Sequence, residues 1–142
     1  MNFLPVLREL VRTYQAFESY SSTHIRSLGL SSVQFDVIAT LANQEPMTYK
    51  ELSEKTLISK TSLTGVIDRM VQKGLLGLEA HENDGRSQRI HLTAKGQKVF
   101  SKVFPAHMDY LEQAFKRLST KELKAIETNL QNLKLIFMKE KS

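Results

Sequence analysis

Side chains suited to binding an anion gather in two short stretches of the sequence, residues 59–69 and 84–87. The first stretch opens with a serine that can cap a helix, and it holds a lysine and three further hydroxyl groups: Ser59, Lys60, Thr61, Ser62 and Thr64. Hydroxyl and ammonium groups donate hydrogen bonds to phosphates and to the edges of nucleic-acid bases. A helix N-terminus adds a partial positive charge at the same place. The residue types and their spacing therefore favour contact with a polyanion.

The second stretch lies at Asn83-Asp84-Gly85, a strong turn signal. Arg86 follows directly, and a long side chain on a narrow loop can enter a minor groove of DNA. Asp84 can orient the guanidinium group of Arg86 through a charge-assisted hydrogen bond. Taken alone, this stretch is equally typical of a solvated hairpin turn, so its meaning depends on the elements beside it.

No spacing of residues points to catalysis. The chain of 142 residues contains no cysteine, which excludes thiolate metal sites, thiol nucleophiles and disulfides. It has no glycine-rich phosphate loop and no Gly-x-Ser-x-Gly sequence. None of the four histidines lies three or four residues from another: His24, His81, His91 and His107.

We therefore expect a protein that is not an enzyme, with no catalytic residue, no cofactor and no metal ligands defined by spacing. A zinc site assembled only in three dimensions, from His24, His107 and a carboxylate, stays open at this stage.

The stretch that begins at Ser59 has the pattern of an amphipathic helix. Apolar residues recur on one face, and a basic residue followed by glycine should end the helix at 73–74: Leu63, Val66, Ile67, Met70, Lys73 and Gly74. The opposite face is polar and carries Lys60, Thr61, Ser62, Thr64, Asp68, Arg69 and Gln72. Gly65, in the helix interior, should cost roughly 1 kcal/mol relative to alanine. A close approach to DNA or to another helix would explain that glycine.

A second capped helix and a hairpin surround this amphipathic helix. Thr48-x-x-Glu51 predicts a short helix that runs to about Lys55 and buries Tyr49 and Leu52. About three residues separate the two helices, which is typical of a helix-turn-helix. Alternating apolar residues then predict strands over 76–80 and 90–92, joined by a polar turn over 81–87. Such a hairpin matches the wing of a winged helix-turn-helix, whose second helix can enter a major groove.

Long apolar stripes flank this unit on both sides. We expect helices over 4–28 and 31–41, the second opened by a Ser31-x-x-Gln34 capping box. Further helices should cover 93–118, which Pro105 should kink or split, and 119–137 with nearly heptad spacing. The last of them should open with a capping box, Ser119-x-x-Glu122. A chain of this size has little core in which to bury both stripes. Packing against a symmetry-related copy would bury them, and a monomeric helical bundle is the alternative.

Three segments carry a more specific resemblance: residues 63–76 (LTGVIDRMVQKGLL), 84–87 (DGRS) and 90–96 (IHLTAKG). Together they resemble the MarR family of bacterial winged helix-turn-helix regulators, and the order and length of the elements match over the whole chain. The resemblance implies an obligate homodimer whose N-terminal helix and last two helices interlock, while each wing domain binds half of a pseudo-palindrome. It further implies that the residues from Lys60 to Gly65 enter the major groove and that Arg86 is the wing-tip arginine.

Members of this family often bind small aromatic or phenolic molecules between the dimer helices and the wing domain. Here the resemblance implies a region lined by some of Tyr14, Phe17, Tyr20, His24, Phe35, Phe104, His107, Met108 and Tyr110. Aromatic side chains with polar tips suit an amphipathic ligand, but they are also ordinary core residues. The ligand-binding residues are therefore left unknown.

The fold class that follows is mainly α with a small β-hairpin wing. Residues 1–142 should form a single intertwined domain, with 31–96 as the DNA-binding winged helix-turn-helix and with 1–30 and 97–142 as its helical dimerisation part. The predicted DNA-binding residues are Ser59, Lys60, Thr61, Ser62, Thr64, Gly65, Arg69, Asp84, Arg86 and Ser87. The hypothesis is a cytoplasmic bacterial transcription regulator, acting as a homodimeric repressor that a small effector releases from its operator by a population shift.

The distribution of charge keeps a second hypothesis open. A net charge of +5 and a pI near 9.5 favour an anionic partner. Residues 48–96, however, carry eight basic and six acidic side chains, so this segment could instead serve as a winged-helix module for protein–protein contact. No run of 18 apolar residues is present, so we expect no membrane span, and the first residues lack the pattern of a secretory signal.

Overall fold

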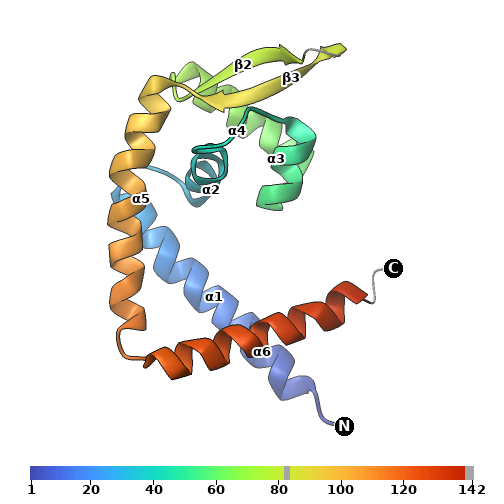
Figure 1. Cartoon of the computed structure of the whole chain (residues 1–142), viewed down its shortest axis with the longest axis vertical. Helices are drawn as coiled ribbons and strands as arrows, with labels where there is room; N and C mark the ends of the chain where they lie inside the picture. The colour runs from blue at the N-terminus through green and yellow to red at the C-terminus, as the bar shows by residue number, and fades with distance from the viewer. Residues whose placement is uncertain (82–83, 140–142) are drawn as a thin grey trace. The chain divides into compact units, whose positions relative to one another are not determined.

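The computed structural model describes residues 1–81 and 84–139, which divide into two compact units, Met1–His107 and Met108–Ser142. The first unit holds α1 (Leu4–Ser27), α2 (Ser32–Leu41), β1 (Met47–Thr48), α3 (Tyr49–Thr56), α4 (Lys60–Gln72), β2 (Leu76–His81) and β3 (Asp84–Leu92). Helix α5 (Ala94–Phe115) begins in this unit and continues into the second, which also holds α6 (Thr120–Lys139). The fold is mainly α with a small antiparallel sheet, as predicted (Figure 1).

Local hydrogen bonds set where the helices begin. The hydroxyl oxygen of Ser31 accepts the amide of Gln34 at 3.1 Å, and the Gln34 side chain accepts the amide of Ser31 at 3.0 Å. Ser119 and Glu122 form the same reciprocal pair at the start of α6. Thr48 caps α3 by accepting the amide three residues later. The predicted caps are confirmed, and each is typically worth about 1 kcal/mol.

Helix α4 ends at the predicted glycine. Gly74 adopts a φ of +77°, the left-handed region that favours glycine. Its amide donates to the carbonyl of Val71 at 2.9 Å, and the amide of Leu75 donates to the carbonyl of Met70 at 3.0 Å. These two bonds form a Schellman motif, which satisfies the last carbonyls of the helix and turns the chain into β2.

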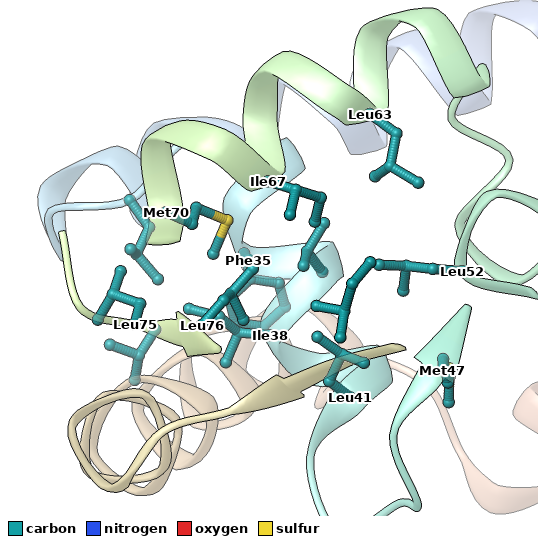
Figure 2. Packing of buried hydrophobic residues seen from close by; sticks show 14 of the residues in the cluster. Phe35, Ile38, Leu41, Met47, Leu52, Leu63, Ile67, Met70, Leu75 and Leu76 are labelled. Carbon is teal, nitrogen blue, oxygen red and sulfur yellow. The ribbon is translucent and has the colours of Figure 1, made fainter. Parts of the chain in front are cut away.

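The hydrophobic core of the first unit lies between α2, α3, α4 and the sheet. Leu63, Ile67 and Met70 of α4 are completely buried and point toward α2 and the strands (Figure 2). They meet buried residues from the neighbouring elements: Phe35, Ile38, Leu41, Met47, Leu52, Leu75 and Leu76. Burying one such side chain stabilises the fold by about 1.5–3 kcal/mol. This packing fixes the position of α4 and leaves its other face exposed.

The sheet has one strand more than the predicted hairpin. Its order is β1-β3-β2, and the short strand β1 places Met47 opposite Ile90. Strand β3 begins at Asp84, well before residue 90, because the register continues to the pair His81 and Asp84. The prediction that His81 and residues 84–87 belong to a turn was therefore wrong, since His81 ends β2 and residues 84–87 begin β3. Glu82 and Asn83, the other two residues of the predicted turn, lie outside the described residues.

Two side chains differ from the prediction in smaller ways. Pro105 lies inside α5 without splitting it, since proline removes only one N–H donor from the helix. The helix ends at Phe115 rather than at the predicted residue 118. Tyr49 is half-buried instead of buried. Burial, followed by the charge of Asp68, raises the pKa of Tyr49 above its ordinary value.

The start of α5 is held against the end of α4. The hydroxyl of Thr93 donates to the carbonyl of Gly74 at 2.5 Å, and its amide donates to the carbonyl of Leu75 at 3.1 Å. The ammonium of Lys95 donates to the carbonyl at the C-cap of α4 at 2.8 Å. A side chain at Gly96 would overlap the carbonyl oxygen of Leu75. The two backbones therefore approach as closely as a glycine allows.

Helices α1 and α6 leave large apolar side chains exposed. On α1 these are Leu4, Val6, Leu7, Val11, Tyr14, Phe17 and Tyr20. On α6 they are Leu123, Ile126, Leu130, Leu135, Ile136, Phe137 and Met138. We call these two sets the α1 stripe and the α6 stripe. Within the part of the chain that the structure describes, no helix is both long enough and apolar enough to cross a membrane.

Candidate nucleic-acid interface

The turn between α3 and α4 is held by side-chain hydrogen bonds. Ser53 donates to the carbonyl of Ile58 at 2.5 Å, and the amide of Ile58 donates to the hydroxyl oxygen of Thr56 at 3.4 Å. Thr56 in turn donates to the carbonyl of Leu52 at 2.7 Å. The side chain of Ile58 packs against the core. The direction in which α4 leaves the turn is therefore fixed by both bonding and packing.

The first turn of α4 carries hydroxyl groups whose bonding roles are partly assigned. Ser59 accepts the amide of Ser62 at 3.3 Å and donates to the Ser62 hydroxyl oxygen at 3.1 Å, so Ser62 keeps its own O–H to donate outward. Thr64 donates to the carbonyl of Lys60 at 3.0 Å, so its oxygen remains available only as an acceptor. The helix thus presents outward donors and acceptors together, the mixture that distinguishes base edges in a major groove.

The predicted residues of α4 all lie on the exposed side of the helix and its cap: Ser59, Lys60, Thr61, Ser62, Thr64, Gly65 and Arg69. A Cβ built on Gly65 would have only the Arg69 guanidinium nearby, at 3.9 Å. Within the described part of the chain, therefore, no other element requires glycine at this position. The sequence offered two explanations for Gly65, close approach to DNA or to another helix. No described helix of this chain approaches it closely.

The wing is a twisted antiparallel pair of strands. Glu79 of β2 lies opposite Arg89 of β3; Glu79 is exposed and Arg89 is half-buried. The register shifts between Ala80 and His81, which is the position of an irregularity that increases local twist toward the tip. The wing residues predicted to bind DNA are placed in β3 by their backbone, while their side chains lie outside the described residues: Asp84, Arg86 and Ser87.

The structure brings His24 and His107 together. Their Nδ1 atoms lie 2.9 Å apart, at hydrogen-bonding distance, and the two rings are nearly parallel, with planes 17° apart and centroids 5.2 Å apart. Ser21, a polar interruption of the α1 apolar pattern, places its hydroxyl 3.0 Å from Nε2 of the buried His107. Burial, followed by the neighbouring His24, lowers the pKa of His107. Among the described residues no group of three His, Cys, Asp or Glu side chains could hold a metal ion.

The aromatic residues considered for an effector separate into three sets. Phe35 packs against Phe104 at 6.3 Å between centroids and against the edge of His107 at 5.0 Å. The aromatic residues of the α1 stripe are exposed in the single chain, and Met108 and Tyr110 belong to the second unit. The first set accounts for part of the core, as sequence reasoning allowed.

Known proteins resemble this chain in both sequence and fold. A model of the MarR family matches residues 28–87. The HTH-type transcriptional regulator MhqR of Bacillus subtilis is 27% identical over 126 residues, covering 89% of this chain and 87% of that protein. A MarR-like transcription regulator of Bacillus cereus superposes with a TM-score of 0.84 at 25% identity, covering 94% of this chain and 96% of that one.

A third similar protein is Bordetella bronchiseptica BpsR, with a TM-score of 0.80, 25% identity and coverage of 92% and 98%. The structure of BpsR concerns how 6-hydroxynicotinic acid regulates the DNA binding of that protein. The first two relatives are named as transcription regulators, in agreement with the prediction that the chain is not an enzyme.

Proposed function

We propose that this chain, a winged helix-turn-helix transcription regulator of the MarR family, binds duplex DNA with α4 in a major groove and the wing against an adjacent groove. The observation that carries the proposal is the exposed face of α4. It combines an ammonium group, outward hydroxyl donors and acceptors, and a glycine that no other described element requires. These groups are suited to contacts with the phosphates and base edges of duplex DNA, and solvent exposure alone does not account for their combination.

The residues proposed to contact DNA are those predicted from the sequence. On α4 and its cap they are Ser59, Lys60, Thr61, Ser62, Thr64, Gly65 and Arg69. On the wing they are Asp84, Arg86 and Ser87, with Arg86 in the minor groove and Asp84 orienting it.

The protein is proposed to act as a homodimer. The α1 and α6 stripes expose many large apolar side chains in the single chain, several of them more than half exposed. Soluble proteins rarely leave such continuous apolar surface uncovered. A second copy would bury both stripes and would pair two α4 helices for a pseudo-palindromic operator.

We further propose that the protein acts as a repressor whose DNA affinity falls when a small aromatic effector binds. Support comes from BpsR, whose DNA binding is regulated by an aromatic acid. The effector would favour a half-site spacing that does not fit adjacent major grooves, and it would lower DNA affinity only by its preference for that state.

The proposal is tested by selecting bound sequences from a random duplex pool and then titrating the selected site at several salt concentrations. Arg86→Ala should weaken binding about tenfold and reduce the salt slope by about 1. Arg26→Ala, an exposed arginine on α1, is the matched control and should change neither quantity.

The same titration separates the proposal from the protein–protein alternative. A DNA-binding regulator should bind random duplex with micromolar affinity at low salt, and this affinity should collapse as salt rises. Absence of any salt-dependent DNA affinity would favour a winged helix used only for protein contact.

A further inference from the structure

The turn of the helix-turn-helix contains a residue that is costly in two ways. Leu57 adopts φ +61° and ψ +21°, the left-handed region in which a Cβ is disfavoured. Its side chain is also 92% exposed, so its apolar surface gains nothing from burial. Helix-turn-helix turns often contain glycine, which would avoid both costs.

The fold itself gives no reason for a leucine at this position. The bonds that hold the turn involve Ser53, Thr56 and Ile58, and the side chain of Leu57 takes no part in them. Among the described residues, the other non-glycine with positive φ is Asn43, a type that adopts this conformation readily. Leu57 is thus the described position where a residue type that disfavours the left-handed region adopts it. Such backbone strain is concentrated at functional sites.

The position of Leu57 indicates what it contacts. It lies two residues before the α4 cap, so its Cα is within about 7.6 Å of that of Ser59. The exposed residues that follow are Ser59, Lys60 and Thr61, all polar. A protein partner would need a wider apolar patch, whereas a duplex offers isolated apolar groups among polar ones, namely thymine methyls and deoxyribose carbons.

We propose that Leu57 contacts DNA, packing its side chain against thymine methyl groups or deoxyribose beside the first turn of α4. This inference rests on the proposed function, since it places Leu57 at the edge of the same interface. The strained conformation is retained because it holds an apolar group outward, toward the duplex.

Leu57→Asn tests the inference by separating stability from binding. Asparagine tolerates the left-handed region, so the unfolding midpoint should rise by roughly 3–6 °C. Affinity for the selected operator should nevertheless fall about five- to tenfold, with the salt slope unchanged because no phosphate contact is lost. Leu57→Met, which keeps an apolar side chain, should retain affinity within about twofold.

Lys60→Ala, measured on the same operator, distinguishes the two proposals, because it should weaken binding and reduce the salt slope by about 1. If Lys60→Ala does so while Leu57→Asn binds like the wild type, the proposed function stands and the role of Leu57 is overturned. A wild-type chain that binds no duplex would overturn both.

The chemical source of the contact is read from an operator in which single thymines are replaced by deoxyuridine. A position where wild type loses affinity and Leu57→Asn loses none identifies a thymine methyl group. If no position behaves this way while the variant still binds more weakly, the contact is to deoxyribose.

Discussion

Helices α4 and α1 are both amphipathic, but α4 buries its apolar face within the chain and α1 leaves most of its apolar face exposed. Leu63 and Ile67 of α4 are completely buried within their own chain. Leu4 and Val11 of α1 are 51% and 53% exposed. In α4 the polar face is exposed and the apolar face is buried, whereas in α1 the apolar stripe itself is exposed.

The difference shows that helical periodicity predicts a buried face without saying which molecule buries it. Helix α4 packs against α2, α3 and the sheet, all within the same compact unit. The α1 stripe extends beyond that core, and among the described α1 residues only Ser21 and Ile25 are buried. A second copy of the chain is the partner that we propose for the remainder.

Matched leucine truncations should give the largest effect. Leu63→Ala should lower the free energy of unfolding by about 3 kcal/mol, because it removes contacts and leaves a cavity in a packed core. Leu4→Ala should cost less than about 1 kcal/mol when measured on a dilute chain. Chemical denaturation of both variants provides the measurement, and equal losses in dilute solution would remove the contrast between the two helices.

Val11→Glu addresses the partner of the α1 stripe. A charge placed in an apolar interface is poorly solvated, so the dimer dissociation constant should rise at least tenfold. Sedimentation velocity over a concentration series measures the change. The control is Arg12→Gln, because Arg12 is exposed and both side chains are polar. A chain that sediments as a monomer before mutation would contradict the dimer and favour the helical-bundle alternative.

A smaller effect should appear in the pH dependence of stability, through the contact of α1 with His107. The pKa of His107 is lowered in the fold, so below its ordinary value of 6.5 the unfolded chain binds a proton that the folded chain resists. The stabilising contribution is present above pH 6.5 and is lost as the pH falls through the lowered pKa. The free energy of unfolding should therefore decrease with acidification in this range.

His107→Gln should flatten that part of the pH profile while keeping a hydrogen-bonding side chain beside Ser21. An unchanged slope in His107→Gln would show that another group titrates there.

Local signals predicted most of the fold. The caps at Ser31, Thr48, Ser59 and Ser119 and the glycine end of α4 were all predicted, because each depends on residues within one or two turns. The exposed side of α4 followed from periodicity alone, since its apolar residues define the buried side. The same periodicity could not tell that Tyr49 would be only half-buried.

Contacts between distant residues were the ones that the sequence did not reveal. Strand β1 is two residues long and exists only because Met47 pairs with Ile90. The bond between His24 and His107 joins residues far apart in sequence, and neither spacing nor residue type required it. The one local trace was Ser21, whose polar side chain interrupted the apolar pattern and proved to be a partner of His107.

The close junction at Gly96 has a mechanical consequence. Three hydrogen bonds and a backbone contact join the first turn of α5 to the end of α4, leaving no compliant segment between them. We therefore expect a rotation of that first turn to move the end of α4 with it. Any signal that changes the pitch of α4 can enter through α5, and a residue larger than glycine at position 96 would force the two apart.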